Sequence, residues 1–241
     1  AAALSPLVVT NLAIFDPVQY GRYLDDAHVA IASFGGAFLI LVSLKYFFND
    51  RKIVHWIVVV EKHLSRWGGI EAIEIALTLS ILLASALIVP HEAAKILIAG
   101  LIGVILFIAV EGIAQAFELQ AGANIAKSSV AFFVYLEVLD AAFSLDGVIG
   151  AFAITSNLLM IIAGLGIGAL FVRAFTIYLV RTRMLETLPY LEHGAHWAIF
   201  GLALAMFGSI FVHVPEPLTG FIGLFFISFS YISSRREIRN S

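Results

Sequence analysis

The sequence predicts an all-α protein, a polytopic bundle of transmembrane helices. Hydrophobic residues make up 61% of the 241 residues, and charged residues make up 13%, about half of their usual share. Several apolar runs are long enough to cross the hydrocarbon layer, which takes about 20 residues in a helix. These runs do not alternate between apolar and polar residues, as the strands of a membrane barrel do, so their backbone groups must be paired within helices.

The composition also excludes several classes of function. The net charge of −3 provides no basic field for nucleic acid, and no nucleic-acid partner is predicted. The absence of cysteine excludes disulfides, thiolate metal sites and cysteine nucleophiles. Because the sequence has no P-loop, no nucleotide fingerprint and no nucleophile–base arrangement, we do not expect an enzyme.

Seven apolar runs are predicted to span the membrane as one domain over residues 1–241. Their ranges are 28–48, 70–89, 95–117, 129–152, 157–180, 195–212 and 217–233.

The basic residues predict the orientation of these spans. With seven spans, ten of the fourteen Lys and Arg residues fall on one side, in segments 49–69, 118–128, 181–194 and the tail. Two, Arg22 and Lys95, fall on the other side. The positive-inside rule therefore predicts a cytoplasmic C-terminus in a bacterial inner membrane. Segment 49–69 could form an amphipathic helix at the membrane surface.

Two short segments resemble each other, which is either coincidence or an internal repeat. The motif YLDDAHVAI at 23–31 matches YLEHGAHWAI at 190–199 with one gap. The spans that follow them are predicted to run in opposite directions, as the halves of an inverted repeat do. Within the second half, the spans 129–152 and 157–180 precede the motif, whereas no span precedes the motif of the first half, so we expect two further helices before residue 1.

The repeat predicts four parts within the single domain. They are the end of the first repeat, a connecting segment with two spans, the second repeat, and the last span with its basic tail: 1–48, 49–128, 129–212 and 213–241.

The span at 129–152 carries most of the ionisable groups predicted to lie at membrane depth. Glu137, Asp140 and Ser144 fall within about 60° of one another on a helix. Asp146 points to the other face unless the helix breaks near Gly147, which would bring it round to the same stripe. Three carboxylates and a hydroxyl are hard oxygen ligands and suit Mn²⁺, Ca²⁺ or Mg²⁺. The alternative is that these acids pair with Arg173 and only hold helices together.

Other ionisable residues also lie within the predicted spans, and Glu111 and Arg173 have two interpretations each. Glu111 is either a ligand or proton site, or a protonated side chain bonded to a neighbour. Arg173 is the predicted counter-charge of the acidic span, with snorkelling as its alternative. Lys45 is expected to snorkel, and Glu74 to reach the interface without a function.

Glu192, His193 and His196 form an E-H-x-x-H pattern at a helix start. The spacing suits metal binding or proton relay, and its alternative is capping and interfacial hydrogen bonding. His28 is the counterpart of His196 in the repeat and carries the same two interpretations.

Three segments of the chain resemble the TerC family of membrane proteins, which belongs with the LysE-type exporters. They read FFVYLEVLDAAFSLDGVIGAFAIT, GLGIGALFVRAFTIYLV and YLEHGAHWAI, and the resemblance extends over residues 16–233, closest to a bacterial TerC-like branch. It implies two inverted halves, each with an acidic helix. Ser144 and Asp146 match the S-x-D motif of the second half, whereas the E-x-x-L-S-x-D-N motif of the first half is not in this chain.

The resemblance implies a divalent metal exporter in metal homeostasis or tellurite resistance. The sequence therefore predicts a gradient-coupled secondary transporter for Mn²⁺ or Ca²⁺, with the lipid bilayer and the metal ion as its partners. A homo-oligomer or a larger membrane complex remains open. The alternative function is a non-transporting scaffold subunit whose acids are structural.

Overall fold

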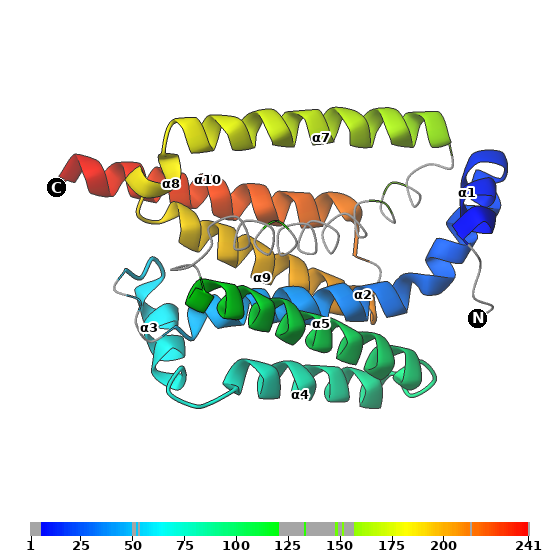
Figure 1. Ribbon diagram of the computed structural model, residues 1–241, viewed down its shortest axis with the longest axis horizontal. Helices are drawn as coiled ribbons and strands as arrows, with labels where there is room; N and C mark the ends of the chain where they lie inside the picture. Colours follow the sequence, from blue (N-terminus) through cyan, green and yellow to red (C-terminus); the bar gives the residue numbers. More distant parts are fainter. Residues whose placement is uncertain are drawn as a thin grey trace.

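The described part of the protein is helical throughout. The computed structural model describes residues 6–49, 52, 54–120, 133, 148, 151, 157–212 and 214–240, and no strand occurs among them. The long helices lie side by side along one axis (Figure 1). In chain order they are α1 (Pro6–Phe15), α2 (Pro17–Phe47), α3 (Val58–Trp67), α4 (Ile73–Ile88), α5 (Ala93–Gln120), α7 (Leu158–Arg181), α8 (Met184–Thr187), α9 (Leu191–Ser209) and α10 (Glu216–Asn240). The predicted all-helical membrane bundle is confirmed.

Six of the seven predicted spans fall on described helices, and the span at 129–152 lies outside the described residues. Segments of α2, α5, α7 and α10 are long and apolar enough to cross a membrane: Pro17–Phe47, Ala93–Gly112, Leu158–Arg181 and Pro217–Arg239. Helix α4 has 16 residues and is about 24 Å long, short of the hydrocarbon thickness. Helix α9 has 19 residues, and its first two turns contain the polar residues Glu192, His193 and His196.

Helix α2 is the centre of the bundle and packs against α4, α5 and α9. Every residue from Ser33 to Leu44 except Phe34 is buried, as a helix that is apolar all round requires. Phe38 meets Phe107 of α5 edge to face, with ring centroids 6.0 Å apart. Against α9, Gly36 lies beside Phe207 near one end of that helix, and Phe47 lies beside Trp197 near the other. The two helices that contain the matched motifs are therefore antiparallel, as an inverted repeat requires.

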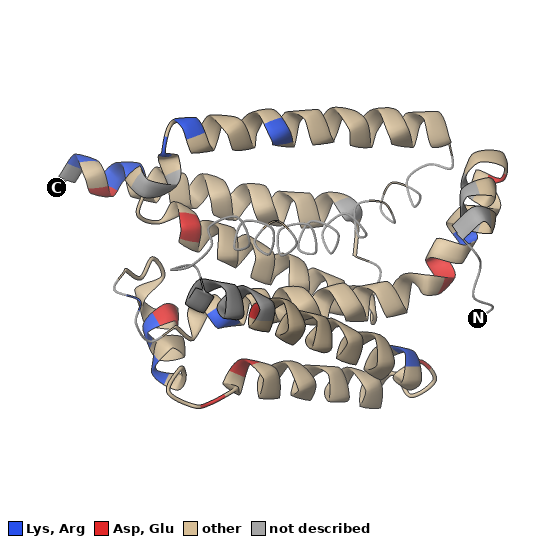
Figure 2. Cartoon of the chain, viewed as in Figure 1, with Lys and Arg blue, Asp and Glu red and all other residues tan. Residues whose placement is uncertain are grey.

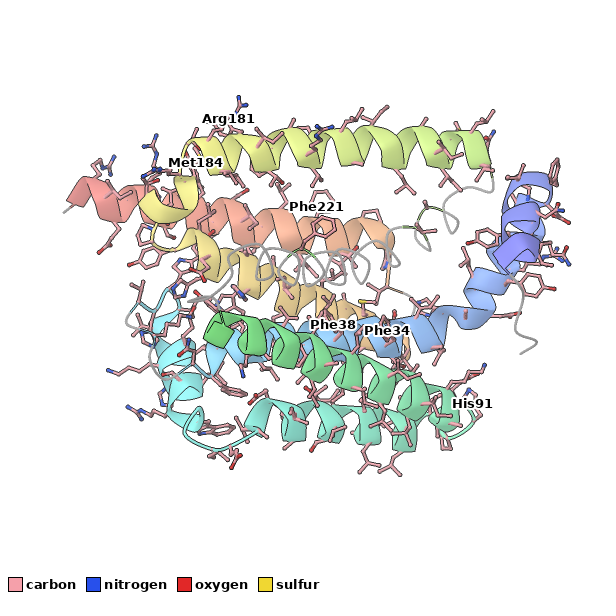
Figure 3. All side chains as sticks on the ribbon, viewed as in Figure 1. Phe34, Phe38, His91, Arg181, Met184 and Phe221 are labelled. Carbon is pink, nitrogen blue, oxygen red and sulfur yellow. The ribbon has the colours of Figure 1, made fainter. Side chains whose placement is uncertain are left out.

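The connections gather at two opposite ends of the bundle. Helix α3, helix α8 and the C-terminus lie at one end, whereas α1 and the turn between α4 and α5 lie at the other (Figure 1). His91 marks that turn, opposite Arg181 and Met184 (Figure 3). Most charged residues lie near these ends rather than along the middle of the helices (Figure 2). Segments 49–69, 181–194 and the tail therefore share one end, as the basic residues predict.

Helix α7 is at the periphery. Ile161 is its buried residue, and large apolar side chains such as Leu159, Leu170 and Phe171 are more than half exposed. An exposed apolar surface of this kind suits contact with lipid, because the bilayer is as apolar as the side chains.

A glycine of α5 permits the close approach of α2. A Cβ atom at Gly103 would overlap the backbone oxygen of Phe34, and α2 and α5 would have to separate. We therefore expect Gly103→Ala to destabilise the protein by about 1–3 kcal/mol, the usual cost of overpacking. Thermal unfolding of the purified protein in detergent measures the change.

The control is Gly112→Ala on the same helix. No atom lies within 4 Å of a Cβ there, so this change should leave the melting temperature unchanged or raise it slightly through helix propensity. Equal melting temperatures for the two variants would contradict the close approach of α2 and α5.

Candidate functional site

The four residues predicted on the acidic span lie outside the described residues. They are Glu137, Asp140, Ser144 and Asp146. The metal site proposed for them therefore stays a prediction. Among the residues that the structure describes, no three His, Asp or Glu side chains are grouped so that they could hold a metal ion.

The best-defined polar site of the described bundle is built around Glu61, at the end where α3 lies. Glu61 stands in the first turn of α3 and is fully buried. One carboxylate oxygen accepts a hydrogen bond from the backbone N–H of Trp56 at 3.2 Å, and the other from that of Ile57 at 3.4 Å. Amide groups at a helix N-terminus lack partners within the helix, and a carboxylate there also interacts favourably with the helix dipole. The carboxylate thereby stabilises the start of α3.

Three side chains from distant parts of the chain complete the surroundings of the Glu61 carboxylate. Lys52 Nζ lies 3.1 Å from Oε2, and Trp197 Nε1 donates to Oε1 at 3.0 Å. His193 Nδ1 lies 2.8 Å from Oε2. An ionised carboxylate only accepts hydrogen bonds, so Nδ1 carries the proton. Glu61 thus ties the loop before α3 to α9.

Aromatic rings from α2 and α9 enclose this group. The ring of His196 stacks on Tyr46 with centroids 3.7 Å apart and 5° between the planes. Lys52 Nζ lies 3.8 Å from the centroid of the same Tyr46 ring, a cation–π contact. We call Tyr46, Lys52, Glu61, His193, His196 and Trp197 the Glu61 cluster.

Burial and charge act in opposite directions on the Glu61 carboxyl. Burial raises its pKa, but hydrogen bonds from His193 and Trp197 and the attraction of His193 and Lys52 outweigh this effect and lower the pKa to about 2. For Lys52, burial lowers the pKa, and the attraction of Glu61 offsets this only in part. The Glu61 carboxylate is therefore ionised near neutral pH, and its negative charge opposes the fall in the pKa of the buried Lys52.

The Glu61 cluster has a structural role, because its hydrogen bonds hold the loop before α3 against α9. A carboxylate has about four lone-pair positions, and Glu61 already receives five donors. It therefore has no acceptor position left for a cation.

The predicted E-H-x-x-H residues divide between the Glu61 cluster and the surface. His193 is buried and bonded to Glu61, whereas Glu192 is exposed. His196 Nδ1 lies 2.9 Å from the backbone oxygen of Glu192. His28 is half-buried on α2 and lies about 28 Å along the helix from Phe47. Because Phe47 contacts Trp197, the neighbour of His196, His28 is far from His196. The structure brings His193 and His196 together, places the exposed Glu192 beside them through its backbone oxygen, and leaves His28 apart.

A second group of charges connects α2, α4 and α5 near the same end, with Lys45 exposed and Glu74 and Glu111 partly buried. Lys45 Nζ on α2 lies 3.7 Å from Glu111 Oε1 on α5 and 4.0 Å from Glu74 Oε1 on α4. Glu111 is about 27 Å along α5 from its start at Ala93, near the far side of the hydrocarbon layer rather than at its midplane. Glu111, predicted as a metal ligand or a proton site, therefore has a cationic neighbour.

Arg173 is exposed on α7. The acids that it is predicted to balance lie outside the described residues, so its role as a counter-charge remains a prediction.

The sequence interpretation missed Glu61, Lys52 and Tyr46 as members of a site. Segment 49–69 could form an amphipathic helix at the membrane surface by its sequence, and the structure has the helix α3 over Val58–Trp67 of this segment. The available signal was Glu61 itself, a single acid that follows three valines. Its partners could not be identified, because His193 and Trp197 lie more than 130 residues further along the chain.

Comparison with known proteins identifies relatives at the level of a family. A family model described as "Protein of unknown function (DUF475)" matches residues 1–241. A stretch of 112 residues is 30% identical to the uncharacterized membrane protein YceF of Bacillus subtilis (strain 168). This match covers 44% of the chain and 42% of YceF, so it spans less than half of that relative. No solved structure matches the chain.

The charge on Glu61 should be needed for the stability of this end of the bundle. The Glu61→Gln change preserves the shape of the side chain but leaves the Lys52 ammonium buried without its counter-charge. Breaking a buried ion pair in this way typically costs about 3–5 kcal/mol, and we expect a loss of that order in thermal unfolding.

Two further variants separate the ion pair from other effects. Glu71→Gln removes an exposed carboxylate close to α3 and should change little. Adding Lys52→Met to Glu61→Gln removes the unpaired charge and should recover part of the loss. A melting temperature that is unchanged in Glu61→Gln would show that the pair does not stabilise the fold.

Stability should also depend on pH through Glu61. Its pKa is about 2 in the folded protein against an ordinary value of 4.5, so the carboxyl binds protons more readily after unfolding. Its contribution is fully present above about pH 4.5 and is lost as the pH falls toward 2. The difference in melting temperature between wild type and Glu61→Gln should narrow as the pH falls below about 4.5. A difference that stays constant down to pH 3 would contradict the lowered pKa.

Proposed function

Because the chain belongs to the DUF475 family and is a multi-pass membrane protein, we propose from its own residues that it transports divalent metal ions. The proposed substrates are Mn²⁺ and Ca²⁺. The resemblance to the TerC family and the LysE-type exporters supports export as the direction. No enzymatic step forms part of this proposal.

The observation that carries the proposal is the acidic content of one predicted span. Glu137, Asp140 and Asp146 stand within ten residues of it, together with Ser144. Carboxylates at membrane depth cost several kcal/mol each, so a chain retains them there when they bind something. Four hard oxygen donors form at least half of the six to eight ligands that Ca²⁺ takes, which leaves positions for backbone carbonyls, water or a second acidic helix. Mn²⁺ also prefers such donors.

The remaining ionisable residues have supporting roles in the proposal. Glu111 would complete the site or carry a coupling proton, and Arg173 would balance the acids when no metal is bound. His193, His196 and Glu192 are the candidates for a proton relay at the Glu61 end of the bundle, and His28, which lies far from them along α2, would act separately. Since the sequence has no nucleotide-binding motif, coupling would use an ion gradient. The basic end of the bundle, with the C-terminus, would face the cytoplasm from a bacterial inner membrane.

A scaffold subunit without transport activity is the second candidate. The Glu61 cluster supports it, because there a buried acid serves to hold helices together. If the acids of the predicted span were saturated in the same way, they would also be structural.

Transport by proteoliposomes tests the proposal. Vesicles that contain the full-length protein and a trapped fluorescent metal indicator should accumulate Mn²⁺ or Ca²⁺ faster than empty vesicles. The Asp140→Asn variant should reduce this uptake to the empty-vesicle rate, because it removes a charged ligand while preserving the size of the side chain.

The matched control is Asp26→Asn, which removes an exposed carboxylate near the start of α2. It should transport at the wild-type rate. Normal uptake by Asp140→Asn would make the acidic stripe structural, and no uptake of any divalent ion by the wild type would favour the scaffold.

A further inference from the structure

Helix α3 occupies a constrained place at the face of the membrane. It connects α2, which ends at Phe47, with α4, which begins at Ile73, and both neighbours are apolar helices of the bundle. This ten-residue helix lies at one end of the bundle (Figure 1). Because the ends of membrane-spanning helices lie at the level of the headgroups, we expect α3 to meet lipid headgroups as well as water.

The orientation of α3 about its own axis is fixed at both ends. At the first turn, Glu61 is held by Lys52, His193 and Trp197. Just after the last turn, Gly68 lies so close to the backbone oxygen of Phe48 that a Cβ atom would overlap it. Because α3 is held at both ends, the face opposite Glu61 stays outward.

This outward face combines apolar and basic side chains. At 100° per residue, Val59 lies within about 20° of the direction opposite Glu61, and its side chain is 76% exposed. Lys62 and Arg66 lie on one flank and are exposed. Val60 and Trp67 lie on the other flank, and Trp67 is 54% exposed. Exposed valines and a tryptophan together with basic side chains are typical of helices that lie in the interface of a membrane.

We propose that α3 is a binding surface for anionic lipid headgroups. Val59, Val60 and Trp67 contact the boundary between headgroups and acyl chains, and Lys62 and Arg66 bind lipid phosphates. The complementarity of charge favours lipid over other partners, since the one acid of α3 is turned inward and neutralised by Lys52. This inference is independent of the proposed transport function.

Site-directed labelling measures the depth of α3 directly, because the chain has no cysteine. A nitroxide label on Val59→Cys is compared in two vesicles, one of phosphatidylcholine and one that also contains phosphatidylglycerol. With phosphatidylglycerol, the label should lose collisions with a water-soluble relaxation agent and gain collisions with oxygen. Ile238→Cys, exposed near the end of α10, should stay open to water in both vesicles.

A second variant tests the role of the basic flank. Replacing Lys62 and Arg66 by Gln in Val59→Cys should remove the difference between the two vesicles while the protein stays folded, because both side chains are exposed. Full access of water to Val59→Cys in both vesicles would overturn the proposal. Equal protection in both would also overturn it, as would protection that rises with protein concentration, which would indicate a second copy of the chain.

Discussion

The structure at one end of the bundle depends on a single ionised carboxylate. Glu61 accepts hydrogen bonds from two backbone amides and three side chains, and these groups come from the loop before α3 and from α9. The Tyr46 ring on α2 joins the same cluster through Lys52 and His196. Without the negative charge of Glu61, the buried Lys52 ammonium would have no counter-charge, and its burial would destabilise the packing of α3 against α9.

The Glu61 cluster and the packing of α2 support each other. Helix α2 is buried along its second half and makes the largest part of the core, but apolar contacts alone do not fix how far a helix slides along its neighbours. Hydrogen bonds are directional, so the link between Glu61, His193 and Trp197 sets the register of α9 relative to α3. The end of α2 lies in the same cluster, with Phe47 against Trp197 at 4.7 Å.

The helices were predictable from the sequence, whereas the Glu61 cluster was not. Length and hydropathy identify α2, α5, α7 and α10 because the bilayer dictates both properties. The spans found from length and hydropathy, together with the basic loops between them, also predict that α2 and α9 run in opposite directions. The partners of Glu61 depend on how α3 folds back against α9, and no local pattern encodes a contact across 132 residues. For the same reason, the sequence identified Glu111 as ionisable in the membrane but did not reveal Lys45 beside it.

The two kinds of acid in this chain differ in the charges that accompany them. Glu61 has Lys52 nine residues before it and His193 beside it in space, so its negative charge is balanced within the described structure. The predicted span at 129–152 contains three carboxylates and no Lys, Arg or His. Its charges must therefore be balanced from outside the span, by protons, by another helix such as the one that carries Arg173, or by a bound cation. A single arginine neutralises one of three carboxylates, and a divalent ion together with that arginine neutralises all three. This balance of charge is the physical reason for preferring a cation site to a purely structural cluster in that span.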